Sequence, residues 1–114
     1  MEFSPEQIAE LKTIVPELAT ADEGGNSFIL LKNCNLPGGC TPSVADLLLC
    51  AVPRDGYESR LFFPVQIAGG PARNWNGNLR LLDKNWFAFS WRTASGLRLA
   101  EMLVIHLNGL RHET

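Results

Sequence analysis

The stretch that decides the fold runs from residue 86 to 110 and begins Trp-Phe-Ala-Phe-Ser-Trp-Arg (86–92). Alternate side chains of an extended chain lie on opposite faces, so Phe87, Phe89 and Trp91 share one face of a predicted strand. Farther along, apolar residues recur at helical spacing from Leu99 to Leu110. This spacing predicts a helix over about residues 97–110, with one apolar face that packs on the sheet.

A second helix is predicted near the other end, where Ser4-Pro5-Glu6-Gln7 is typical of a helix N-terminus. Apolar residues from Ile8 to Leu18 give it one stripe, and Pro16 limits its extent. Residues 69–78, rich in Gly and Asn, are predicted to be an irregular loop, where function often lies. Extended segments bounded by turn residues are predicted at 27–32, 46–52, 61–65, 79–82 and 86–91. We therefore expect an α+β fold in which an antiparallel meander sheet packs with an N-terminal and a C-terminal helix.

Length and composition fit one globular domain over residues 1–114, because 46% of the residues are hydrophobic and the net charge is −2. The longest apolar runs, 47–52 and 102–107, are far shorter than the roughly 20 residues that cross a bilayer, so no membrane partner is expected. Residues 1–6 lack the basic start and apolar core of a secretory signal. We expect a cytoplasmic protein.

Charge is unevenly distributed along the chain. Residues 1–25 carry six acidic side chains and one lysine, whereas residues 60–98 carry six basic side chains and one aspartate. Nucleic-acid binding requires a clustered basic face and a basic domain, so no nucleic-acid partner is expected. The basic second part favours docking of an acidic protein, and a solvated surface with scattered arginines is the alternative reading.

The three cysteines, Cys34, Cys40 and Cys50, form an odd set with no export signal. This pattern predicts reduced thiols rather than a disulfide framework. A zinc site would need a histidine as fourth ligand, and the spacings lack the tight pair typical of such sites. No metal and no organic cofactor are expected.

Six short motifs lie between residues 36 and 102. They are Leu-Pro-Gly-Gly (36–39), Asp-Leu-Leu-Leu (46–49), Pro-Arg-Asp-Gly-Tyr (53–57), Asn-Trp-Asn-Gly (74–77), Trp-Phe-Ala-Phe-Ser-Trp-Arg (86–92) and Leu-Arg-Leu-Ala-Glu-Met (97–102). Together with the element order, they resemble the ubiquitin-conjugating (E2/UBC) superfamily, most closely its prokaryotic E2 family E. The resemblance covers about residues 26–110 and implies a single UBC-like domain. That bacterial branch occurs in operons with ubiquitin-like proteins, an E1-type adenylating enzyme and a JAB-type peptidase.

In the usual enzymes of this superfamily, an Asn precedes the cysteine that carries ubiquitin as a thioester. The resemblance places Asn74 at the Asn and Arg80 at the cysteine, and no cysteine follows Cys50. A thioester at the usual position is therefore excluded, and two other nucleophiles remain open.

The first candidate nucleophile is Ser90, which would carry the acyl group as an oxyester. A serine hydroxyl needs a base within hydrogen-bond reach, and His106 on the sheet-facing side of the C-terminal helix is the candidate. The side-chain amides of Asn74 and Asn76 would donate to a developing oxyanion. Each residue also has a structural reading: a small strand residue, a core histidine and turn-forming asparagines.

The second candidate nucleophile is Cys40, in a turn where its thiol would be exposed. Cys34 and Cys50 lie in strand-like runs and are expected to be inert packing thiols.

The resemblance implies an E2-like carrier that receives a ubiquitin-like protein from an E1-type enzyme and passes it to a target protein. The expected catalytic residues are Ser90, His106 and Asn74, and the E1-type enzyme consumes the ATP. The alternative is a noncatalytic pseudo-E2 scaffold that binds the E1-type enzyme, the ubiquitin-like protein or both.

Overall fold

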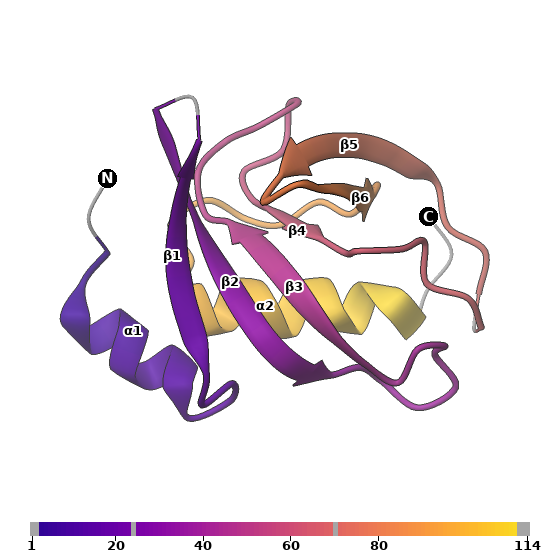
Figure 1. The fold of residues 1–114 in the computed structure, drawn as a ribbon, viewed down its shortest axis with the longest axis horizontal. Coiled ribbons are helices and arrows are strands. Elements are labelled where there is room, and N and C mark those ends of the chain that lie inside the picture. The colour runs from indigo at the N-terminus through magenta and orange to yellow at the C-terminus, as the bar shows by residue number, and fades with distance from the viewer. Residues whose placement is uncertain (1–2, 24, 70, 112–114) are drawn as a thin grey trace.

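Two helices and two antiparallel sheets form a small α+β domain in the computed structural model, which describes residues 3–23, 25–69 and 71–111 (Figure 1). The elements in chain order are α1 (Pro5–Lys12), β1 (Leu18–Glu23), β2 (Asn26–Asn35), β3 (Val44–Cys50), β4 (Arg60–Phe62), β5 (Trp75–Leu81), β6 (Lys84–Phe89) and α2 (Leu99–Asn108). A short 3₁₀ turn, Gly109–Arg111, follows α2. The expected α+β class with an N-terminal and a C-terminal helix is confirmed.

Helix α1 begins where the capping residues predict. The Ser4 hydroxyl accepts a hydrogen bond from the backbone N–H of Gln7 at 3.4 Å, and Pro5 occupies the first helical position. The helix ends at Lys12, and the expected continuation of its stripe to Leu18 was wrong. Leu18 instead opens β1 opposite Leu31, because Pro16 cannot continue the helix and pairing with β2 satisfies the backbone.

The main sheet is a four-stranded antiparallel meander in the order β1-β2-β3-β4. The expected antiparallel arrangement is confirmed, whereas β1 is a strand that was not predicted from the sequence. Alternate residues of its strands enter two different apolar clusters. In β3, Leu47 and Leu49 pack toward the helices, whereas Leu48 packs toward the β5–β6 hairpin. Both faces of the central strands are therefore covered, the rear one by α2, as Figure 1 shows.

The β5–β6 hairpin corrects the prediction that residues 69–78 form one irregular loop. β5 begins at Trp75, which pairs with Phe89, and a register shift separates this pair from Gly77 and Ala88. Phe87 and Phe63 exchange two backbone hydrogen bonds of 2.7 and 2.8 Å, which join the hairpin to the chain beyond β4. The second half of this Gly- and Asn-rich stretch is therefore strand.

Helix α2 lies across the sheet and buries Leu99, Leu103 and His106. Its first N–H group, on Leu99, donates to the Oε1 atom of Gln7 at 3.0 Å, so α1 caps α2. The indole of Trp91 donates to the carbonyl oxygen of Ile105 at 3.0 Å. These contacts hold α2 against the segment that follows β6, where Ser90 lies.

Candidate functional site

Ser90 is the first residue after β6, and it is half-buried. Its backbone N–H donates to the carbonyl oxygen of Asn74 at 2.8 Å, which continues the strand pairing by one residue. Its hydroxyl lies 2.8 Å from the phenol oxygen of Tyr57, and either oxygen is able to donate. The segments at 57 and 90 are therefore joined through two side-chain hydroxyl groups.

Asn76 and Arg60 extend this contact into a chain of hydrogen bonds. Arg60 donates to the Oδ1 atom of Asn76, which leaves the Nδ2 group of Asn76 facing Tyr57. That amide donates to the phenol oxygen of Tyr57 at 3.0 Å. The phenol oxygen thus lies between an amide donor and the Ser90 hydroxyl.

Two guanidinium groups lie against the ring of Tyr57. The Cζ atom of Arg60 is 4.2 Å from the ring centroid and that of Arg92 is 4.9 Å away, both within cation–π range. Arg92 also donates to the carbonyl oxygen of Gly56 at 3.1 Å, which holds it beside the turn. We call Tyr57, Ser90, Asn76, Arg60 and Arg92 the Tyr57 cluster.

The hydrogen bond with Ser90 is the main cause that lowers the pKa of Tyr57, followed by the hydrogen bond from Asn76. Burial opposes this effect, and the positive charges of Arg60 and Arg92 lower the pKa further. The two hydrogen bonds and the two positive charges favour the phenolate, whereas burial disfavours it. The cluster therefore stabilises negative charge on the Tyr57 oxygen.

Arg60 is the central buried group of the cluster, with only 2% of its surface exposed. It pairs with Asp55 at 3.2 Å and donates to the carbonyl oxygen of Phe89 at 3.2 Å. Gly77 makes room for it, since a Cβ atom there would lie 2.9 Å from Nη1 of Arg60. A buried charge with this many partners fixes the geometry around Tyr57.

His106 is placed differently from the prediction that it serves Ser90. Its Nε2 atom lies 2.9 Å from the hydroxyl of Ser59, which in turn lies 2.9 Å from the hydroxyl of Thr93. Ser59 and His106 are 1% and 3% exposed, so this pair is closed to a substrate. Burial, and then the charge of Arg60, lowers the pKa of His106 to about 4. His106 is thus hydrogen-bonded to Ser59, and Ser90 is hydrogen-bonded to Tyr57.

Asn74 is exposed and directly precedes β5. The hydrogen bond that joins it to Ser90 runs through its backbone oxygen. The side-chain amide that the structure places next to the Ser90–Tyr57 pair is that of Asn76. Of the two asparagines considered from the sequence, Asn76 thus donates its side-chain amide to Tyr57.

Sequence reasoning missed Tyr57, Arg60 and Ser59 as partners of the candidate residues. Tyr57 is the only tyrosine in the chain and ends the Pro-Arg-Asp-Gly-Tyr motif, which was a usable signal. Arg60 lies beside the apolar run 61–63, where a charge needs a buried partner. Nothing local in the sequence shows that residues 57, 76 and 90 meet.

The cysteines are all free and all buried. Cys34 and Cys50 are packing thiols as expected, and burial raises the pKa of Cys34 to about 11 and also raises that of Cys50. The expected exposure of Cys40 was wrong, because its exposed fraction is 8% and it packs into the core beneath its turn. A buried thiol at Cys40 is poorly placed to receive an acyl group.

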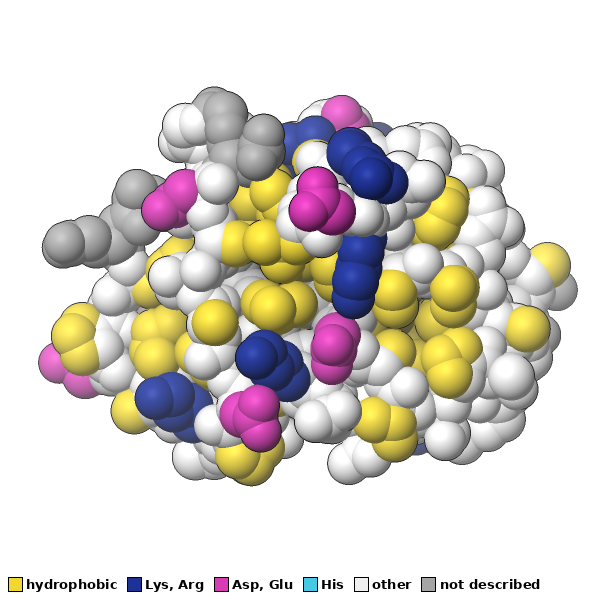
Figure 2. Space-filling view, viewed as in Figure 1, with side chains coloured by type: hydrophobic (Ala, Val, Ile, Leu, Met, Phe, Trp, Pro, Cys, Tyr) yellow, Lys and Arg dark blue, Asp and Glu magenta, His cyan; other side chains and the backbone are white. Residues whose placement is uncertain are grey.

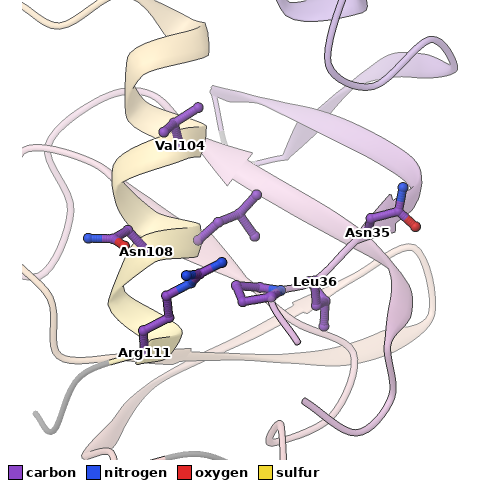
Figure 3. A pocket seen from close by; sticks show the side chains of 7 residues that line it. Asn35, Leu36, Val104, Asn108 and Arg111 are labelled. Carbon is purple, nitrogen blue, oxygen red and sulfur yellow. The ribbon is translucent and has the colours of Figure 1, made fainter. Parts of the chain in front are cut away.

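A separate groove lies between the C-terminal end of α2 and the segment that follows β2 (Figure 3). Val104, Asn108 and Arg111 line one side and Leu36 the other, and the cavity measures about 310 Å³. No residue of the Tyr57 cluster lines this groove. We place the candidate chemistry at the cluster because reactive hydroxyl and cationic groups converge there.

The surface and the metal-ligating residues add little to this picture. Figure 2 shows apolar, basic and acidic side chains interspersed on one face of the domain. Among residues 3–23, 25–69 and 71–111, no group of three or more His, Cys, Asp or Glu side chains is placed to hold a metal ion. In the same part of the chain, neither helix has the length and apolar character that crossing a bilayer requires.

Comparison of this chain with protein-family models, with curated proteins and with solved structures finds no match in any of the three.

Proposed function

We propose that this chain is a UBC-like carrier that accepts a ubiquitin-like protein from an E1-type adenylating enzyme and holds it as an oxyester on Ser90. The carried protein then passes to a target protein in the cytoplasm. The observation that carries the proposal is the placement of Ser90, half-buried, with its hydroxyl 2.8 Å from the Tyr57 phenol.

The order of elements supports the UBC-like part of the proposal. A helix, a four-stranded antiparallel meander and a later helix across one face of the sheet follow one another in the chain. These are the elements that the sequence resemblance to prokaryotic E2 family E implies. The motif 86–92, which is part of that resemblance, contributes Ser90 and Arg92 to the cluster.

The transfer to Ser90 is an acyl exchange in which atoms and protons balance. The Ser90 oxygen attacks the carbonyl carbon of the thioester on the E1-type enzyme, and the carbon–sulfur bond breaks. The serine proton ends on the departing thiolate, and an ester and a thiol are the products. The guanidinium groups of Arg60 and Arg92 keep positive charge against the ring of Tyr57, whose oxygen contacts the Ser90 hydroxyl.

A noncatalytic scaffold is the second candidate function. It is favoured by the closed Ser59–His106 pair, which removes the one histidine of α2 from the serine that would need it. A scaffold would bind the E1-type enzyme or the ubiquitin-like protein and form no covalent adduct.

The experiment mixes the chain with its E1-type enzyme, its ubiquitin-like partner and ATP, and then separates the products on a denaturing gel. We expect an adduct that survives thiol reductant and is lost in hydroxylamine or strong base. Ser90→Ala abolishes it, whereas Ser95→Ala, at an exposed serine five residues along, retains it.

Two other results would contradict the carrier proposal. An adduct cleaved by reductant and lost in Cys40→Ala assigns the acyl group to Cys40. Binding to either partner with no adduct under any condition assigns the chain to the scaffold class.

A further inference from the structure

We propose that Tyr57 is the catalytic acid–base residue for Ser90, taking the hydroxyl proton as the serine attacks. This inference rests on the proposed carrier function for its natural substrate, but it concerns a nucleophile that a small electrophile is also able to test. It assigns to the phenol the role that the sequence assigned to His106.

Geometry is the first argument. The two oxygens are 2.8 Å apart, which is the normal distance for a hydrogen bond between hydroxyl groups and is within reach for proton transfer. The residues come from different parts of the chain, Tyr57 from the turn after β3 and Ser90 from the end of β6. Their meeting is therefore a product of the fold rather than of local sequence.

Orientation is the second argument. Arg60 donates to Oδ1 of Asn76, so the amide of Asn76 is turned with its Nδ2 group toward Tyr57. The phenol oxygen already accepts that hydrogen bond, which leaves its other contact, with Ser90, as the path for a proton. A phenolate formed there keeps a donor from Asn76 throughout the reaction.

Electrostatics is the third argument. The charged groups that face Tyr57 are Arg60 at the start of β4 and Arg92 after β6, and both are positive. Asp55 is the nearby carboxylate, and its charge is paired with Arg60 at 3.2 Å. These charges and hydrogen bonds lower the pKa of Tyr57 from its ordinary value, which brings the phenolate closer to neutral pH.

A fluorophosphonate probe tests this chemistry without any partner protein. The Ser90 oxygen attacks phosphorus, the phosphorus–fluorine bond breaks, fluoride leaves, and the serine proton moves to the Tyr57 phenolate. The labelling rate should rise with pH and level off above the pKa of Tyr57. Because the chain has one tyrosine, titration of its phenolate absorbance measures that pKa directly.

The variant Tyr57→Phe keeps the ring for the two guanidinium groups and removes only the hydroxyl. We expect it to slow labelling of Ser90 by about 100-fold or more and to abolish the plateau of the pH profile. Circular dichroism should show that the variant remains folded. Equal labelling rates in Tyr57→Phe and the parent chain would overturn the inference, as would no labelling of Ser90 at all.

Asn76→Asp provides a graded test, because Asp retains an acceptor for Arg60 and replaces the amide donor with a carboxylate oxygen. The titrated pKa of Tyr57 should rise, and the plateau of the labelling profile should move upward by the same amount. Asn78→Asp introduces the same charge on β5 outside the cluster and should shift neither. A plateau that stays in place while the tyrosine titration moves would overturn the inference.

The two proposals fail in distinguishable ways. If labelling of Ser90 depends on Tyr57 but no adduct of the ubiquitin-like protein forms, the carrier proposal is contradicted and the acid–base proposal is supported. An adduct on Ser90 that forms equally well in Tyr57→Phe would retain the carrier function and remove the acid–base role.

Discussion

Arg60 and His106 are both buried polar residues, but their partners differ. Asp55, Asn76 and the carbonyl oxygen of Phe89 all contact Arg60 and offset the cost of burying its charge. His106 has one hydroxyl partner, Ser59, and a positive neighbour in Arg60, so the neutral ring is the stable form. A buried histidine held neutral makes stability depend on pH.

Acid should destabilise the fold through His106. In the unfolded chain its pKa is about 6.5, whereas burial lowers it to about 4 in the folded state. Between these values the unfolded state binds more protons, so the free energy of unfolding falls as pH is lowered. We expect a loss of about 2 kcal/mol between pH 7 and pH 5, measured by urea unfolding.

The control for this prediction is His106→Gln, which has no titrating group at the same position. This variant should be less stable than the parent chain at pH 7 and should lose much less stability between pH 7 and pH 5. If both proteins lose stability equally over that range, other groups cause the acid sensitivity.

At the scale of elements, the two helices share the apolar core and are also joined by an amide side chain. The first N–H group of a helix has no partner inside that helix, and Gln7 of α1 supplies one to Leu99 of α2. Arg98 and Glu10 also join the helices, at 2.9 Å, but both are exposed and such pairs contribute little to stability. The hydrogen bond from Leu99 to Gln7 is therefore the polar link that matters more.

Gln7→Ala should lower the free energy of unfolding by about 1 kcal/mol, which is typical of losing a helix cap. The matched control is Gln66→Ala, at an exposed glutamine between β4 and β5, which should leave stability nearly unchanged. Urea unfolding at pH 7 measures both. Equal stability of the two variants would show that water replaces the Gln7 cap without cost.

At the scale of the whole molecule, the central strands have an apolar cluster on each face. Leu47 belongs to the cluster under the helices and Leu48 to the cluster under the β5–β6 hairpin, and both are fully buried. Arg60 and the Phe63–Phe87 pairing also tie the hairpin to the sheet. The two clusters are thus separated only by the thickness of one sheet, which favours a single cooperative transition.

Leu47→Ala and Leu48→Ala should each lower the free energy of unfolding by about 2–5 kcal/mol, because each leaves a cavity in a closed cluster. Tryptophan fluorescence reports the second part of the chain, since all three tryptophans lie between residues 75 and 91. Its transition should coincide with that of far-ultraviolet circular dichroism in both variants. A fluorescence transition that comes first in Leu48→Ala would show that the hairpin unfolds separately.

The sequence by itself determined the elements whose signals are local. Ser4 and Pro5 mark the start of α1, and the spacing of Leu99, Leu103 and His106 marks the buried face of α2. Turn residues that bound apolar runs mark β2, β3 and β4 of the meander. Proline, capping residues and periodicity act within a few residues, so they are readable without a structure. β1 was missed because its first residue, Leu18, also fits the end of the helical stripe.

Only the tertiary structure decided the partners of the candidate residues. Ser90 was chosen from its sequence neighbourhood, but its contact with Tyr57 spans 33 positions, and that of His106 with Ser59 spans 47. Such pairings depend on strand register and on the side of α2 that faces β4, which one sequence does not display. Burial has the same origin, because it lowers the pKa of His106 and covers Cys40 through residues that are distant in the chain.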